Sequence, residues 1–176
     1  QQQTPVACFV TPHGFGHAAR ASPVMVALQE RNPDLQFKIF TQVPDWFFAQ
    51  SGVVNFTYTR LKTDVGLVQD SPMHEDLPAT LEQLNHELPY RLGVLDELGQ
   101  MVADCQFIIC DVSTMGIAVA EVADIPSILI ENFTWDWVYQ QYASRAAGMR
   151  RHAGYLRTMR QRAKVLIQAE PICHHR

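Results

Sequence analysis

The residues best suited to chemistry lie in one short stretch, residues 11–20, which holds two histidines and two glycines. His13 and His17 are its only side chains that exchange protons near neutral pH. Gly14 and Gly16 permit backbone angles that a Cβ forbids, and they let a ligand approach the main chain closely. The stretch therefore predicts either a ligand-binding loop with an acid–base histidine or a plain glycine-rich turn with two solvated histidines.

The elements on either side of this stretch predict where it lies. Residues 6–10 form an apolar, β-type run that leads into it, and a helical pattern follows it. The N-terminus of that helix directs N–H groups and a positive dipole end at the loop, which favours an anion or a developing negative charge there. Ser22 and Pro23 mark a second candidate start for the helix, because serine caps helices and proline suits their first turn.

Strands and helices alternate through the rest of the chain. After residues 6–10, strand patterns are predicted at residues 35–41, 53–58, 107–110, 125–130 and 164–169. Helical patterns fall between them, at residues 24–32, 80–98, 113–123 and in the basic stretch after residue 139, and Pro89 should kink or split the second. Because several strands are apolar on both faces, the pattern predicts the α/β fold class: a Rossmann-like, doubly wound parallel sheet of about six strands, with helices on both faces. Residues 1–176 form a single domain in this interpretation.

Three polar clusters, at residues 13–17, 111–114 and 132–139, each fall at the carboxyl end of a predicted strand. Ligands of such sheets bind beyond these strand ends, so the coincidence favours a functional site over three unrelated turns. Residues 59–78 show no periodicity, and a segment of that length in a compact domain is usually functional or mobile.

Composition narrows the class of protein. Apolar residues make up 47% and charged residues 18%, which is typical of a globular rather than a disordered chain. The net charge of -4 gives no general attraction to nucleic acid, so no nucleic-acid partner is expected. The basic residues between 145 and 164 predict a solvated helix face or a contact with an anionic partner. No apolar run approaches the length of a membrane span and no leader pattern opens the chain, so we expect no transmembrane segment and a cytoplasmic location.

The four cysteines show no C-x-x-C spacing. Three of them lie in apolar runs and are expected to be buried thiols of a protein from a reducing compartment. Cys173, His174 and His175 form a candidate metal tract, but no partner ligands at zinc-like spacing accompany them. A linker remnant is therefore favoured, and no metal is expected.

Three stretches resemble one family of proteins. Residues 10–23, VTPHGFGHAARASP, resemble the first-loop motif of GT-B glycosyltransferases, especially the HGFGHxxR form of the L-arabinokinase-type N-terminal domain and related glycosyltransferase-like proteins. Residues 109–139 resemble the strand, helix, strand and NF(S/T)WD segment of that group, and residues 65–71, VGLVQDS, resemble its mid-domain loop. The resemblance covers residues 6 to about 171.

This resemblance implies one half of a two-domain enzyme. A GT-B enzyme has two Rossmann-like domains, and its nucleotide-sugar site lies mainly on the C-terminal one. The chain resembles the N-terminal, acceptor-side half, so a C-terminal GT-B domain is expected in cis or as a separate subunit. The implied reaction transfers a sugar from a nucleotide sugar, which is a substrate rather than a cofactor, to a small-molecule or lipid-linked acceptor. No other cofactor is implied.

The resemblance also implies catalytic roles. His17 matches the position that serves as general base in many inverting members, where it removes the proton of the acceptor hydroxyl. Asp111 is the natural carboxylate to orient that histidine. In the alternative interpretation, Asp111 caps the helix that begins near Ser113, and His17 forms only a local hydrogen bond. Arg20, one turn after His17, either meets a phosphate or carboxylate of the acceptor or is a surface charge.

Further residues are assigned to substrate binding. They are His13, Gly14, Gly16 and Arg20 in the first cluster, Ser113 in the second, and Asn132, Trp135 and Asp136 in the third. The tryptophan offers a flat face on which a sugar ring can stack, and the amide and carboxylate can bind hydroxyl groups. Ordinary core packing is the alternative for the aromatic residues.

Two other functions remain open. One is a non-catalytic module, either a sugar- or nucleotide-binding domain or the docking half of a bipartite enzyme. An exposed apolar edge around the last strand or the aromatic segment would favour the docking half. The other is a nucleotide-sugar epimerase, which by resemblance shares this architecture and turns over a nucleotide sugar without any acceptor.

Overall fold

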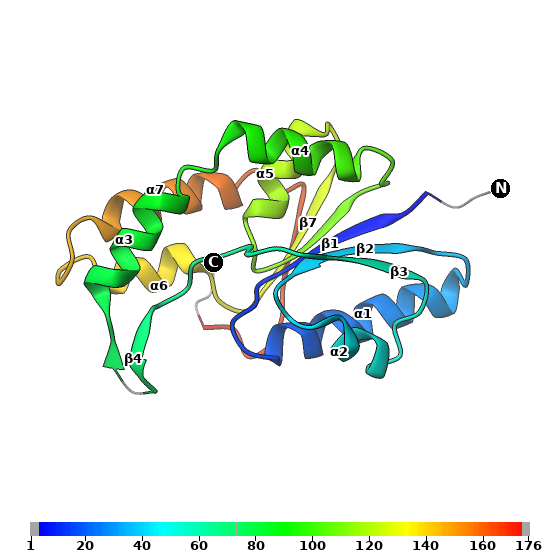
Figure 1. Ribbon diagram of the computed structural model, residues 1–176, viewed down its shortest axis with the longest axis horizontal. Coiled ribbons are helices and arrows are strands. Elements are labelled where there is room, and N and C mark those ends of the chain that lie inside the picture. The colour runs from blue at the N-terminus through cyan, green and yellow to red at the C-terminus, as the bar shows by residue number, and fades with distance from the viewer. Residues whose placement is uncertain (1–3, 73, 174–176) are drawn as a thin grey trace.

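The central feature of the computed structural model, which describes residues 4–72 and 74–173, is a parallel sheet of six strands (Figure 1). In chain order the strands are β1 (Val6–Val10), β2 (Phe37–Thr41), β3 (Phe56–Arg60), β6 (Ile108–Asp111), β7 (Ser127–Glu131) and β8 (Val165–Gln168). They lie side by side in the order β3-β2-β1-β6-β7-β8, and every neighbouring pair is parallel. The predicted fold class, a doubly wound Rossmann-like sheet, is confirmed.

Helices cover both faces of this sheet. α1 (Gly16–Arg31) and α2 (Asp45–Gln50) lie on one face, and α4 (Leu92–Val102) and α5 (Met115–Val122) lie on the other (Figure 1). α3 (Leu77–Glu87), α6 (Trp135–Gln141) and α7 (Met149–Arg160) pack together beyond the carboxyl ends of the strands, near the hairpin of β4 (Gln69–Ser71) and β5 (His74–Glu75). Within the described part of the chain, no helix combines the length and the apolar character that crossing a membrane requires.

Alternation along β1 builds a separate core on each face of the sheet. Ala7 and Phe9 belong to the core under α4 and α5, whereas Val6, Cys8 and Val10 belong to the core under α1 and α2. Successive side chains of a strand point to opposite faces, so a sheet covered on both sides requires strands that are apolar throughout. The predicted burial of three of the four cysteines is confirmed.

The first helix begins earlier than its second candidate start. α1 runs from Gly16 through Pro23, so a helix start at Ser22 is wrong. The Ser22 hydroxyl instead donates to the carbonyl of Ala18, one turn back in the same helix. Pro23 removes one backbone hydrogen bond, but the buried face of α1 keeps the helix continuous, because tertiary packing contributes most of the stability of such helices.

Pro89 divides the long helical pattern as expected, because α3 ends at Glu87 and α4 begins at Leu92. The stretch without periodicity, residues 59–78, contains the end of β3, the β4–β5 hairpin and the start of α3. Its first part, residues 61–68, crosses the carboxyl edge of the sheet without regular structure and takes part in the site described below.

Gly116 lies where α5 packs tightly against the sheet. A Cβ at this position would lie 2.6 Å from Sγ of Cys110 and 2.9 Å from Cβ of Phe9. The Gly116→Ala variant should therefore lower the free energy of unfolding by about 1–3 kcal/mol through overpacking.

The matched control is Gly154 in α7, where a Cβ would have no heavy atom within 4 Å. Gly154→Ala should raise the free energy of unfolding by about 0.5–1 kcal/mol, because alanine is the better helix former. Urea unfolding of both variants measures the difference. Equal effects at the two positions would contradict the close contact between α5 and the sheet.

Candidate functional site

The candidate site lies where the strand order of the sheet reverses. β1 is flanked by β2 on one side and β6 on the other. The strands that follow β1 directly, β2 and β3, lie on one side of it, and the later strands β6, β7 and β8 lie on the other. Val10 is in register with Asp111, which places the last residue of β6 beside the end of β1. Ligands of doubly wound sheets bind in the crevice at this switch point.

Asp111 is the centre of a charged cluster at this point. Its side chain is 0% exposed, and its Oδ1 lies 2.9 Å from Nδ1 of His17. Arg20 adds two hydrogen bonds, from Nη2 to Oδ1 at 2.6 Å and from Nε to Oδ2 at 2.8 Å. His17 and Arg20 reach the same carboxylate because they are three residues apart and so share one face of α1. The interpretation of Asp111 as a helix cap is wrong, since α5 has Thr114 at its N-cap and no side-chain cap.

The loop after β7 completes this cluster. Nη1 of Arg20 donates to Oδ1 of Asn132 at 2.7 Å. The ring of Phe133 meets the imidazole of His17 edge on, with centroids 5.5 Å apart. The structure thus brings together members of all three predicted clusters. Because the guanidinium of Arg20 contacts protein groups, its direct contact with an acceptor stays a prediction.

The contact with Asp111 sets the tautomer of His17. An ionised carboxylate only accepts hydrogen bonds, so Nδ1 of His17 must donate, and the neutral ring then carries its lone pair on Nε2. Directly after Asp111, Val112 has a φ of 61°, which is an uncommon backbone angle for a β-branched residue. Strained backbone of this kind gathers at functional sites, and here it turns the chain sharply at the end of β6.

His13 lies beside the cluster in a largely enclosed position. Its ring meets Trp135 edge on, with centroids 4.7 Å apart, and it leaves no room for a Cβ at Gly66. Burial lowers the pKa of His13 to about 4, with smaller contributions from His17 and Lys62. His13 is therefore neutral at neutral pH, and within the described structure its buried Nε2 has no hydrogen-bond partner.

Sequence reasoning missed Asp64, which lies in the loop after β3. Its Oδ2 accepts a hydrogen bond from the hydroxyl of Thr63 at 3.3 Å. Burial raises the pKa of Asp64 to about 6, against the effect of this hydrogen bond. The signal in the sequence was the absence of periodicity over residues 59–78, which marked the loop but singled out no residue.

The other predicted site residues are spread around the same edge of the sheet. Gly14 adopts a φ of 73° in the first loop, and Gly16 opens α1. Ser113 is buried after Asp111, and its Oγ has no hydrogen-bond partner among the described residues. Asp136 is buried away from this cluster, where it pairs with two arginines of α7 at 3.4 and 3.5 Å. The substrate-binding roles of these residues stay predictions.

The described residues offer no metal centre. Among residues 4–72 and 74–173, no three His, Cys, Asp or Glu side chains are placed so that they could share an ion. In the candidate tract at the end of the chain, Cys173 is a free, exposed thiol, and His174 and His175 lie outside the described residues.

The fold and this cluster define the class: a Rossmann-like α/β domain with a histidine, a carboxylate and an arginine joined at its switch point. In sequence, the chain is similar to L-arabinokinase of Arabidopsis thaliana, with 30% identity over an alignment of 146 residues; the match covers 80% of this chain and 14% of that protein. This similarity agrees with the resemblance stated above, whereas the assignment of the first-loop motif stays a prediction.

Among solved structures, the chain resembles a UGT transferase from Siraitia grosvenorii in complex with UDP. The TM-score is 0.49 and the sequence identity is 12%, over 93% of this chain and 41% of that chain. No family model matches the chain. The chain thus spans less than half the length of each of these two proteins.

Removing the charge of Asp111 should lower the stability of the folded chain. In Asp111→Asn the buried partner of His17 and Arg20 is lost, and we expect the free energy of unfolding to fall by about 2 kcal/mol or more. Asp70 is the matched control, because it forms the same kind of pair with His74 at 2.9 Å but with both side chains more than half exposed. Asp70→Asn should change stability by no more than about 0.5 kcal/mol. Denaturant unfolding distinguishes the two, and a near-neutral Asp111→Asn would contradict a tightly held carboxylate.

His13 should make the chain sensitive to acid. Because its pKa is about 4 in the folded state and about 6.5 when unfolded, the unfolded chain binds the proton first as the pH falls. Between pH 6.5 and pH 4 the natural chain should therefore lose on the order of 2 kcal/mol of stability relative to His13→Gln. Thermal or urea unfolding across this pH range gives the difference in slope. Parallel stability curves for the two proteins would show that His13 is not buried in the neutral form.

Proposed function

We propose that this chain is the acceptor-side domain of a glycosyltransferase-like protein, in which His17 removes the proton of an acceptor hydroxyl as that oxygen attacks the sugar of a nucleotide sugar. The observation that carries the proposal is the 2.9 Å contact between His17 and the buried Asp111 at the switch point of the sheet. In such pairs the carboxylate holds the imidazole in one orientation and stabilises the imidazolium that forms.

The surroundings of His17 suit proton transfer. Its side chain is 12% exposed, so it is held on one side by Asp111 and remains open to a substrate. Neither Gly14 nor Gly16 has a heavy atom within 4 Å of where a Cβ would lie, which leaves space in front of the loop for a ligand to approach the main chain. The N-terminus of α1, which is the positive end of the helix dipole, also lies at this loop.

Arg20 and Asn132 act as positioning residues in this proposal. Arg20 holds both oxygens of Asp111 and also the side chain of Asn132, so the carboxylate cannot rotate away from His17. Precise placement of the base matters because proton transfer requires hydrogen-bond distance to the reacting hydroxyl. The similarity to a protein named for a sugar, L-arabinokinase, further supports a carbohydrate as the class of substrate.

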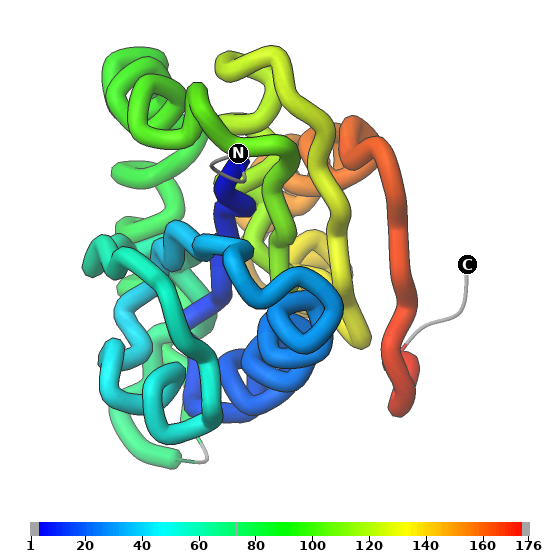
Figure 2. Tube along the Cα trace, turned by 90° about the vertical axis from the view of Figure 1, so that its right-hand side faces the viewer, coloured from blue at the N-terminus to red at the C-terminus, as the bar shows by residue number. Residues whose placement is uncertain are grey.

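One observation favours a second candidate, the docking half of a bipartite enzyme. β8 lies at an edge of the sheet, and Val165, Leu166 and Ile167 are 45%, 43% and 46% exposed. Three consecutive exposed apolar residues on an edge strand are typical of a surface that another domain or subunit covers. The strand stands apart at one side of the molecule in Figure 2. Docking and catalysis are compatible, since a second domain would supply the nucleotide-sugar site.

The substitution His17→Ala should lower sugar transfer by at least about a hundredfold while the chain stays folded, because it removes the general base. The assay uses this chain together with the domain or subunit that supplies the nucleotide-sugar site, and follows a radiolabelled sugar from a panel of nucleotide sugars into acceptor. His74→Ala is the matched control, because His74 also pairs with a carboxylate at 2.9 Å but lies on the exposed hairpin. It should keep the full rate.

Two results would change this assignment. Full transfer by His17→Ala would rule out His17 as the base and leave the docking role as the better account. Turnover of the nucleotide sugar without acceptor, lost in His17→Ala, would instead favour epimerase chemistry.

A further inference from the structure

An exposed aromatic surface borders the loop that carries His17. It is formed by Phe15 in that loop and by Trp46 and Phe47 at the start of α2, and we call these three side chains the aromatic platform. Phe15 is 50% exposed and Trp46 is 49% exposed. None of the other large apolar side chains that are exposed in the described part of the chain is aromatic. The exposed aromatic rings therefore gather at this one place.

The fold builds this platform from two separate segments. Phe15 follows β1, and Trp46 and Phe47 follow β2, which is the parallel neighbour of β1, so both segments emerge at the same edge of the sheet. There α2 packs against α1 (Figure 1). The ring of Phe47 also meets the fully buried ring of Phe48 edge on. Because this buried ring anchors α2 in the core, the platform has a rigid base.

The geometry of the rings suits a ligand that is itself a ring. Phe15 stacks on Phe47 with centroids 5.1 Å apart, and the planes of Phe15 and Trp46 are inclined by 48° with centroids 5.9 Å apart. A ligand can therefore lie on one exposed face and touch the other ring with its edge. Aromatic faces carry partial negative charge and attract C–H groups, whose hydrogens are partly positive. A sugar ring presents such C–H groups on its faces and directs its hydroxyl groups outward.

Polar groups that can bind hydroxyls lie beside these rings. Asp45 is exposed, and its Oδ1 accepts a hydrogen bond from the backbone N–H of Trp46 at 2.8 Å. A carboxylate has further acceptor sites, which suit the O–H donors of a carbohydrate. On the other side, Gly14 and Gly16 flank Phe15, and a Cβ at either would have no heavy atom within 4 Å, so a ligand can reach the main chain there.

Two other kinds of partner fit this surface less well. α2 has an acidic residue in its first turn and no basic residue, and residues 11–17 contain no lysine or arginine, whereas anionic lipid surfaces attract basic segments. An apolar protein surface placed here would remove the carboxylate of Asp45 from water without a charged partner, which is unfavourable. A neutral ring with hydroxyl groups avoids both penalties.

We propose that the aromatic platform binds a carbohydrate ring, stacked on Trp46 and Phe15 with a hydroxyl held by Asp45, and that the acceptor of this domain is therefore itself a carbohydrate. The second part rests on the proposed function, whereas binding of the carbohydrate does not. Phe15 and His17 are two residues apart, so their Cα atoms lie within about 7 Å of each other. A ring on the platform, or the next ring of an oligosaccharide, thus lies close to His17.

The test is ligand-observed NMR of the full chain with the methyl β-pyranosides of glucose, galactose and xylose. Sorbitol is the matched probe, because it has the hydroxyl groups but no ring face. At least one glycoside should bind saturably, with a dissociation constant on the order of millimolar for so small a ligand. Saturation should pass mainly to the C–H hydrogens of one ring face, and sorbitol should bind several-fold more weakly. No binding of any glycoside, or equal binding of sorbitol, would overturn the proposal.

Three variants locate the carbohydrate. Trp46→Ala and Phe15→Ala each remove a ring, and Asp45→Asn removes the charge that strengthens the hydrogen bond, so each should weaken glycoside binding several-fold. The controls are Leu92→Ala, whose side chain is 73% exposed on α4, and Asp70→Asn on the exposed hairpin. Both should bind as the natural chain does. Unchanged binding in Trp46→Ala and Phe15→Ala, each checked to be folded, would place the carbohydrate elsewhere and overturn the proposal.

A competing partner and the proposed function give distinguishable outcomes. Sedimentation with phosphatidylglycerol vesicles that Trp46→Ala abolishes, without any glycoside binding, would replace the carbohydrate by a membrane surface. Glycoside binding with the expected pattern in a protein that transfers no sugar would keep the platform and reject the transferase. Transfer that depends on His17 but proceeds at the full rate in Trp46→Ala would keep the transferase and reject the platform as its acceptor site.

Discussion

The need to satisfy one buried carboxylate governs the geometry of the whole site. A carboxylate with no exposed surface is costly unless donors surround it, and Asp111 receives them from His17 and Arg20. Both donors lie on the first turns of α1, so the carboxylate at the end of β6 also fixes how that helix begins over the sheet. Arg20 then reaches Asn132, which ties the loop after β7 to the same point.

This arrangement divides two tasks between neighbouring side chains. Arg20 donates its hydrogen bonds to Asp111 and Asn132 and so holds β6 and the loop after β7 together. His17 makes one such contact and keeps its second ring nitrogen for another partner. A single charged cluster can therefore be rigid and still leave one group available for chemistry, which is the combination a general base requires.

The fold and the location of the candidate site could be predicted from the sequence, but the contacts within the site could not. The apolar strands and the polar residues at their ends gave the fold and the three clusters, because strand periodicity is local and parallel strands end at one edge. The pairing of Arg20 with Asp111 could not be predicted, since it depends on which face α1 turns toward the sheet. Nor could Asp64, because a loop without periodicity carries no sign of which side chain points inward.

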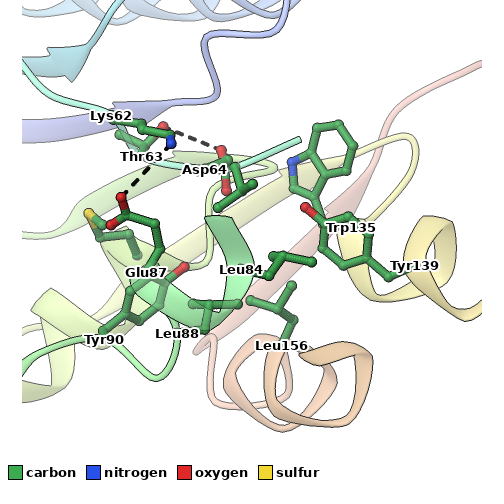
Figure 3. Close-up of a pocket in the computed structure, with 12 residues that line it drawn as sticks. Lys62, Thr63, Asp64, Leu84, Glu87, Leu88, Tyr90, Trp135, Tyr139 and Leu156 are labelled. Carbon is green, nitrogen blue, oxygen red and sulfur yellow. Dashed lines mark hydrogen bonds and ion pairs between the residues drawn. The ribbon is translucent and has the colours of Figure 1, made fainter. Parts of the chain in front are cut away.

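Aromatic contacts, among them that of Trp135 with Tyr139 (Figure 3), extend the packing of the cluster to the loop after β3. The ring of Trp135 lies 5.2 Å from that of Phe133, which in turn lies 5.5 Å from that of His17. On the other side, Tyr139 stacks on Trp135 and donates to the carbonyl of Gly66 at 3.1 Å, which holds the loop after β3 against His13. Because close-packed rings cannot shift independently, the position of Trp135 is coupled through Phe133 to that of His17. The short segment after β7 therefore contributes both to the placement of His17 and to that of the loop after β3.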